Sequence, residues 1–220
     1  MAKPIEWGSH SQVFAFLGNS LLSPMKQTSD AGMDPAFWAL FPDFGDDAVA
    51  SACKRCGEAA SGIVARGMRD GREAAELAST EFTQLFIGPP NPAAAPWESF
   101  YRSKSENPVG FGQATFEMRD LLRAAGLQVI NENNQYEDHI GLELLYLSEL
   151  CRRRAEETAS CLADDGVCGD ESVAVFIESH PLGWIEALRS AVQESHPQGY
   201  IDGILGVAEA SLTSLSVDLR

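Results

Sequence analysis

The chain has 220 residues, 45% of them hydrophobic, and its 32 acidic side chains against 16 Lys and Arg give a formal net charge of -16. A chain of this length forms one large domain or two small ones, and it can bury a substantial core without disulfides or metal. The negative charge makes nucleic acid and anionic lipid unfavourable partners, and it favours basic peptides and basic protein surfaces.

The N-terminal segment is a poor match to a secretory signal peptide. It carries one Lys and an early Pro, and no small-residue cleavage site follows its apolar run. No apolar stretch of the sequence approaches the ~20 residues that span a bilayer. We therefore expect a cytoplasmic protein with no stable insertion into a membrane.

Apolar residues recur with the helical period along almost the whole chain. The only candidate strand is LQVI at 127–130. The pattern predicts an all-α, single-domain helical bundle over residues 1–220, interrupted by a long loop rich in Pro and aromatic residues. In chain order, we predict helices around 13–22, over 45–67, from a capping box at Asp70-x-x-Glu73 to Gly88-Pro89, over 111–126, from Ile140 past Cys151, and after His180-Pro181 and His196-Pro197.

The cysteines do not form a recognisable metal or redox motif. There are five of them, which argues against a disulfide framework in a cytoplasmic chain. Cys53-x-x-Cys56 lies in a helical pattern, no strand precedes it, and there is no second C-x-x-C. We expect Cys53, Cys56, Cys151, Cys161 and Cys168 to be ordinary, partly buried side chains.

An irregular stretch of roughly twenty residues follows Gly88, longer than most connections inside a compact domain. It contains Pro96, Trp97, Tyr101 and Phe111, whereas a solvated linker favours Gly, Ser and charged residues. Two interpretations remain open from these residues. The aromatic side chains either anchor the loop on the helices, or they line a hydrophobic pocket for a peptide.

Glu137, Asp138 and His139 stand at the head of an apolar helical run. One hypothesis is a small metal-dependent hydrolase that uses Asp138 and His139. Neighbouring helical residues point about 100° apart, so a helical metal site needs a partner at i+3 or i+4, and for His139 only Glu143 qualifies. No H-E-x-x-H pattern exists, and the simpler alternatives are helix capping by the carboxylates and a loop hydrogen bond from His139.

Four segments form a recognisable series along the chain: Phe82-Thr83-Gln84-Leu85-Phe86 with Gly88-Pro89, Pro96-Trp97-Glu98-Ser99-Phe100-Tyr101, Gly110-Phe111-Gly112, and Asn134-Gln135-Tyr136-Glu137-Asp138-His139. In this order they resemble the TorD/DmsD/NarJ group of redox-enzyme maturation chaperones. The similarity runs from about residue 80 to 190, and Tyr136 stands where DmsD-like members have Pro. The later His180-Pro181 also looks like the start of that group's C-terminal helix.

This resemblance implies an all-helical, cytoplasmic protein that is not an enzyme and carries no cofactor or metal. Members of the group bind the twin-arginine signal peptide, and sometimes the body, of molybdenum-cofactor oxidoreductases before export. The implied partner is therefore the catalytic subunit of such an enzyme, of the dimethyl-sulfoxide-reductase type. The alternative is a NarJ-like assembly chaperone for a cytoplasmic nitrate-reductase-type subunit. The resemblance also implies a monomer or a domain-swapped dimer.

A receptor for a twin-arginine peptide needs carboxylates beside an apolar groove, since carboxylates pair with guanidinium groups. Exposed ion pairs contribute only ~0–1 kcal/mol, so burial of apolar area, at roughly 25 cal/mol per Å², should contribute more. We expect Glu137 and Asp138, with Glu98 as a third candidate, to supply the carboxylates and His139 to lie beside them. The expected groove residues are Phe82, Leu85, Phe86, Pro96, Trp97, Tyr101 and Tyr136.

Overall fold

A computed structural model of the chain describes residues 4–105, 108–129, 135–160 and 169–220. Over these ranges the regular structure is helical and contains no strand, which confirms the all-α prediction. The α-helices are α1 (Trp7–Leu22), α2 (Pro35–Ala39), α3 (Asp47–Asp70), α4 (Ala74–Phe86), α5 (Glu98–Arg102), α6 (Gln113–Ala124), α7 (Ile140–Ser160), α8 (Asp170–Ser179), α9 (Ile185–Ser195) and α10 (Tyr200–Asp218). Short 3-10 turns are η1 (Met25–Gln27), η2 (Ala31–Met33) and η3 (Pro181–Gly183).

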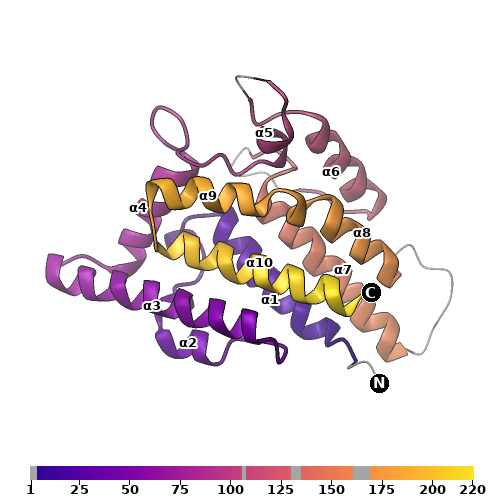
Figure 1. The fold of residues 1–220 in the computed structure, drawn as a ribbon, viewed down its shortest axis with the longest axis horizontal. Helices are drawn as coiled ribbons and strands as arrows, with labels where there is room; N and C mark the ends of the chain where they lie inside the picture. The colour runs from indigo at the N-terminus through magenta and orange to yellow at the C-terminus, as the bar shows by residue number, and fades with distance from the viewer. Residues whose placement is uncertain (1–3, 106–107, 130–134, 161–168) are drawn as a thin grey trace.

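The C-terminal helix α10 lies at the centre of the bundle, with α3 on one side and α9 on the other (Figure 1). It is buried along most of its length, including Ile204, Leu205 and Leu215. A helix that is apolar nearly all round must be enclosed by other elements. One hydrophobic core accordingly contains side chains from α1 through α10.

Helices α1 and α7 pack along each other at a very short distance, made possible by two glycines. A Cβ atom built on Gly18 would lie 2.9 Å from the carbonyl oxygen of Gly141, and one built on Gly141 would lie 2.8 Å from that of Gly18. Real Cβ atoms do not approach so closely, so both positions require Gly. This contact fixes the first turn of α7, which carries Glu143.

The predicted capping box at Asp70-x-x-Glu73 is wrong. Asp70 is the last residue of α3, and Gly71 ends that helix in the left-handed conformation with φ +67°. Glu73 is the residue before α4, and its side chain makes no capping hydrogen bond. The chain therefore reverses between two helices within three residues, where the sequence suggested a single helix start.

The two His-Pro junctions do not start α-helices directly. Pro181 begins the 3-10 turn η3, and α9 follows at Ile185. Pro197 precedes α10 by three residues, because the carboxylate of Glu81 accepts a 2.8 Å hydrogen bond from the Ile201 N–H and so sets the helix start at Tyr200. The candidate strand has no regular structure over 127–129, and residue 130 lies outside the described ranges.

The long loop after α4 folds back onto the bundle and contains the short helix α5. The Ala94 N–H donates to the Leu85 carbonyl at 2.9 Å, which ties the loop to α4. Helices α5 and α6 contact each other and lie together at one end of the molecule (Figure 1). In the described part of the chain, none of the helices is both long and apolar enough to cross a membrane.

Candidate functional site

Three of the expected groove residues belong to the core. Phe82, Leu85 and Phe86 lie on the inner face of α4 and are buried. The rings of Phe82 and Phe86 meet edge to face with centroids 5.2 Å apart, and the Phe86 ring also faces the His139 imidazole. These side chains are therefore part of the core beneath the loop that leads to Trp97.

The Pro96–Trp97 segment is joined through its backbone to the start of α7. Trp97 and His139 form an isolated antiparallel bridge. The Glu98 N–H donates to the Asp138 carbonyl at 3.0 Å, and the Ile140 N–H donates to the Pro96 carbonyl at 3.0 Å. The structure thus brings together two segments, 96–98 and 136–140, that the sequence indicated separately.

Asp138 is a buried structural carboxylate. Its Oδ2 accepts a hydrogen bond from the Ser99 N–H at 2.8 Å, in the first turn of α5, and its Oδ1 accepts from the Thr115 hydroxyl at 2.9 Å. Burial raises the pKa of Asp138, although these hydrogen bonds act in the opposite direction. The side chain therefore links α5, α6 and the segment before α7.

His139 is buried and neutral. Its Nδ1 accepts a hydrogen bond from the Gly141 N–H at 3.0 Å, so the ring proton of the neutral form lies on Nε2. Burial lowers the pKa of His139 to about 3. The sequence suggested a bond from this ring to the 127–136 loop, of which residues 130–134 lie outside the described ranges; the bond seen here goes to α7.

Glu137 is half-buried and already paired with a guanidinium. Its two oxygens accept from Nε and Nη2 of Arg119 on α6, at 2.8 and 3.1 Å. This bidentate contact lowers the pKa of Glu137. The pair shows that the side chain can hold one arginine in the geometry expected for recognition of a basic peptide.

A group of exposed aromatic side chains borders this ion pair. Phe111 is 43% exposed, Phe116 is 45% exposed and Tyr136 is 40% exposed. Tyr136 lies 5.2 Å from Phe111 and 5.8 Å from Trp97, measured between ring centroids. We call Trp97, Phe111, Phe116 and Tyr136 the aromatic patch. Clustered exposed aromatics of this kind mark interaction surfaces.

Gly110 supports the position of Trp97 in the patch. A Cβ atom on Gly110 would lie 2.4 Å from Cε3 of the indole, so the glycine backbone packs directly against the ring. The indole N–H of Trp97 is shielded from solvent and has no hydrogen-bond partner within the described ranges. Sequence reasoning quoted Gly110 within a motif, but it assigned this residue no contact with Trp97.

Tyr101 points away from the patch. It is half-buried and stacks on Trp184, with ring centroids 5.4 Å apart. Trp184 precedes α9, and its indole N–H donates to Oε2 of Glu143 at 3.1 Å. Tyr101 therefore belongs to a second group of side chains, deeper in the molecule.

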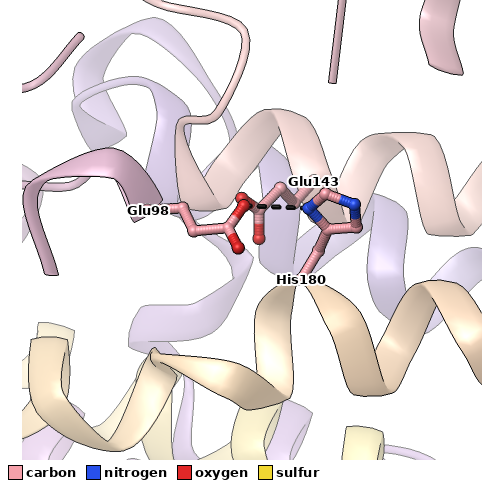
Figure 2. A group of neighbouring side chains, drawn as sticks. All are labelled: Glu98, Glu143 and His180. Carbon is pink, nitrogen blue, oxygen red and sulfur yellow. Dashed lines mark hydrogen bonds and ion pairs between the residues drawn. The ribbon is translucent and has the colours of Figure 1, made fainter. Parts of the chain in front are cut away.

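This deeper group contains a cluster of Glu98, Glu143 and His180. Figure 2 shows the two carboxylates and the imidazole converging from α5, α7 and the turn between α8 and η3. Nδ1 of His180 lies 2.9 Å from Oε2 of Glu98, and one ligand atom from each of the three residues lies within 4.8 Å of the others. All three side chains are buried. Burial and the nearby charge of Glu98 raise the pKa of Glu143 well above its usual value.

Sequence reasoning missed this cluster as a unit. Glu98 and Glu143 were noted one at a time, and His180 only as part of a helix start. Within the described ranges, the cluster is the one group of His, Cys, Asp and Glu with metal-ligand spacing. Asp138 and His139 are not members of it, which disfavours the hydrolase hypothesis that rested on them.

A separate cleft lies between α3 and the turn before α10. It encloses about 710 Å³ and is lined by both signs of charge, including Arg55, Glu58 and Arg66.

Cys53 and Cys56, on α3, are buried free thiols, and burial raises the pKa of Cys53 to about 11. They are ordinary core residues, as expected, whereas Cys161 and Cys168 lie outside the described ranges.

The fold and the site define an all-α protein whose exposed aromatic patch is supported by buried polar side chains, including Asp138 and His139. The sequence profile described as nitrate reductase delta subunit matches residues 46–190, and the chain belongs to this family. The resemblance to the TorD/DmsD/NarJ group is thereby confirmed.

Individual relatives carry the name chaperone protein TorD. The chain is 29% identical to the one from Shewanella sp. (strain ANA-3) over 114 residues, which are 52% of this chain and 53% of that protein. It is 30% identical to the one from Vibrio cholerae serotype O1 (strain ATCC 39315 / El Tor Inaba N16961) over 112 residues, which are 51% and 48% of the two chains. The match thus spans about half the length of these relatives.

Proposed function

We propose that the chain is a cytoplasmic, non-enzymatic chaperone that binds the twin-arginine signal peptide and the precursor of a molybdenum-cofactor oxidoreductase of the dimethyl-sulfoxide-reductase type. It holds the precursor for cofactor insertion before export. The observation that carries the proposal is the aromatic patch beside the Glu137–Arg119 pair, in a chain that belongs to this family.

In this proposal the expected site residues act in two layers. Trp97 and Tyr136 contact the apolar segment of the peptide, together with Phe111 and Phe116, and the Glu137 carboxylate contacts an arginine. The remaining expected residues support this surface from within the protein, because most of them are buried or hydrogen-bonded there. They are Phe82, Leu85, Phe86, Pro96, Tyr101, Asp138 and His139.

Arginine recognition at Glu137 would proceed by exchange. A guanidinium of the peptide can replace that of Arg119 with the same bidentate geometry, so little interaction energy is lost at the carboxylate. Arg119 also lies 5.6 Å from the centre of the Phe116 ring and keeps that contact when it is displaced. The net charge of -16 speeds the encounter with a basic peptide.

Calorimetric titration with synthetic twin-arginine signal peptides tests the proposal. Replacing a hot-spot aromatic side chain at the centre of an interface costs about 2 kcal/mol or more, which is at least about thirtyfold in affinity. We expect that loss for Tyr136→Ala and for Phe111→Ala. Because both side chains are substantially exposed, neither substitution should reduce the helical content measured by circular dichroism.

The control is Leu40→Ala, which removes another exposed apolar side chain far from the patch in sequence. It should bind the peptide as the unchanged protein does. Equal losses in all three variants, or no binding of any twin-arginine peptide by the unchanged protein, would contradict the proposal.

A second candidate is supported by the description of the matched family. A nitrate reductase delta subunit profile favours a client of the nitrate-reductase type without a working export signal. The same patch would then bind an N-terminal segment that lacks the arginine pair. Peptides with both arginines replaced by Lys separate the candidates, since only the first loses affinity. In either case we propose a monomer or a domain-swapped dimer.

A further inference from the structure

The two carboxylates of the buried cluster share one arrangement. In each carboxylate, one oxygen accepts a hydrogen bond from an N–H group outside the cluster, and the other oxygen lies on the side of the other two cluster residues. Glu98 Oε1 accepts from Arg102 at 2.9 Å while its Oε2 faces His180. Glu143 Oε2 accepts from the Trp184 indole at 3.1 Å, while its Oε1 has no hydrogen-bond partner among the described residues.

The inward oxygen of Glu143 requires an explanation, because its side chain is fully buried. A buried acceptor left without a partner costs about 1–3 kcal/mol, and more for a charged group. Burial and the neighbouring Glu98 raise the pKa of Glu143, so this carboxyl holds a proton beside Glu98 when no cation is bound. A bound cation would take the place of that proton: it would give the inward oxygen of Glu143 a partner and balance the charges of the two carboxylates.

We propose that Glu98, Glu143 and His180 bind one divalent transition-metal cation of the Mn²⁺-to-Zn²⁺ series. The ligands would be Oε2 of Glu98, Oε1 of Glu143 and Nδ1 of His180. Carboxylate oxygen together with imidazole nitrogen, without thiolate, is the donor set that suits these ions. This inference is independent of the proposed chaperone function.

The surroundings fit a metal site in two respects. The N–H groups of Arg102 and Trp184 hold the outer oxygens of the two carboxylates, which is how outer donors orient metal ligands. The three ligand atoms lie within 4.8 Å of one another. Ligands about 2.0–2.2 Å from one ion are at most roughly 4.4 Å apart, so side-chain shifts of well under 1 Å suffice.

The cation would connect three elements that are distant in sequence. Glu98 opens α5, Glu143 lies in the first turn of α7, and His180 follows α8. Because Trp97 directly precedes Glu98, metal binding would also restrain the segment that presents Trp97 in the aromatic patch. The expected role is structural, as a cross-link between loop and bundle.

Metal binding is tested on the full chain after removal of metals with EDTA. Equilibrium dialysis against MnCl₂ and separately against ZnCl₂, with metal quantified by mass spectrometry, should give about one ion per chain. The melting temperature should rise on addition of either ion. Glu143→Gln and His180→Gln each remove one ligand, so each should weaken Mn²⁺ binding by at least about tenfold.

The matched control is Glu149→Gln, which changes a glutamate of α7 outside the cluster and should leave metal binding unchanged. Mn²⁺ is the decisive probe, because the thiols of Cys53, Cys56 and Cys151 favour Zn²⁺. Glu143→Gln keeps the side-chain shape and removes a buried carboxyl, so it should fold as well as the unchanged chain without metal. The proposal is overturned if neither Mn²⁺ nor Zn²⁺ binds up to about 100 µM, or if Glu143→Gln binds the same ion unchanged.

Discussion

At the scale of single residues, the aromatic patch depends on a glycine. Gly110→Ala places a methyl group where the Trp97 indole now lies, at 2.4 Å from Cε3, so the ring must move. We expect peptide affinity to fall several-fold and the near-ultraviolet circular dichroism to change. Gly62→Ala is the control, because a Cβ there meets nothing within 4 Å. Unchanged affinity and spectrum for Gly110→Ala would show that the position of Trp97 is not set this way.

His139 makes stability depend on pH. Its pKa is about 3 in the folded protein against 6.5 for an ordinary histidine. As the pH falls, the unfolded chain therefore takes up the proton at a higher pH than the folded protein does. The neutral ring therefore favours folding above pH 6.5, and this contribution is lost as pH falls towards 3. Between pH 7.5 and 5 the loss is about 2 kcal/mol.

Urea unfolding of the unchanged protein and of His139→Gln at these two pH values measures this contribution. Other groups titrate over the same range, including Asp138, whose raised pKa acts in the opposite direction. Only the difference between the two proteins isolates His139. The loss on acidification should be about 2 kcal/mol smaller in the variant. Equal losses would mean that His139 is accessible to protons in the folded state.

The sequence indicated the segments 96–101 and 136–139, but it did not indicate the contacts of their individual side chains. Asp138 and Glu137 were expected to face a ligand, yet Thr115 and Arg119 occupy their oxygens. These partners lie 23 and 18 residues away, and no local period relates them. Tertiary contacts therefore decide which polar side chains are free, and a helical pattern contains no information about them.

At the scale of elements, the crossing of α1 and α7 leaves no room for a side chain at Gly18 or Gly141. Gly141→Ala forces a methyl group against the Gly18 carbonyl and the Leu22 side chain, both 2.8 Å away. Backbone cannot yield as a flexible side chain does, so we expect a loss of about 1–3 kcal/mol in unfolding free energy. Chemical unfolding measures it.

Gly8→Ala, in α1 with open space around it, is the control for this crossing. It should leave stability nearly unchanged or raise it, because Ala favours helix over Gly by about 1 kcal/mol. If Gly8→Ala lowered the unfolding free energy as much as Gly141→Ala, the two helices would be sensitive to any added methyl group. The close backbone contact would then not explain the effect.

Helix positions were largely predictable, whereas helix ends were not. The apolar period located α3, α4, α6 and α7 to within a few residues. The ends depend on partners outside each helix, such as Glu81 at the start of α10. Short helices also escaped the prediction: α2 and α5 have five residues each, too few to show a period of 3.6.

At the scale of the whole molecule, two separate surfaces could receive a client. The aromatic patch is carried by α6 and by the segments just before α5, α6 and α7, and α5 and α6 lie together at one end of the fold (Figure 1). The cleft of about 710 Å³ is lined by α3 and by the turn before α10. The cleft is lined by Arg55, Arg66 and Arg189 as well as by Glu58, Glu81 and Asp202, so it offers an arginine-bearing peptide no excess of negative charge. The patch offers apolar area and a carboxylate in the geometry that arginine requires, and we therefore propose that the client binds at the patch.

Hydrogen–deuterium exchange of the protein with and without a twin-arginine signal peptide tests this assignment most directly. Binding at the patch should slow exchange in the segments 97–102, 110–119 and 135–139, because a ligand stabilises the local structure that it contacts. Exchange in 195–203, beside the cleft, should remain the same. Protection confined to 195–203 and α3, or no protection anywhere under saturating peptide, would contradict the account.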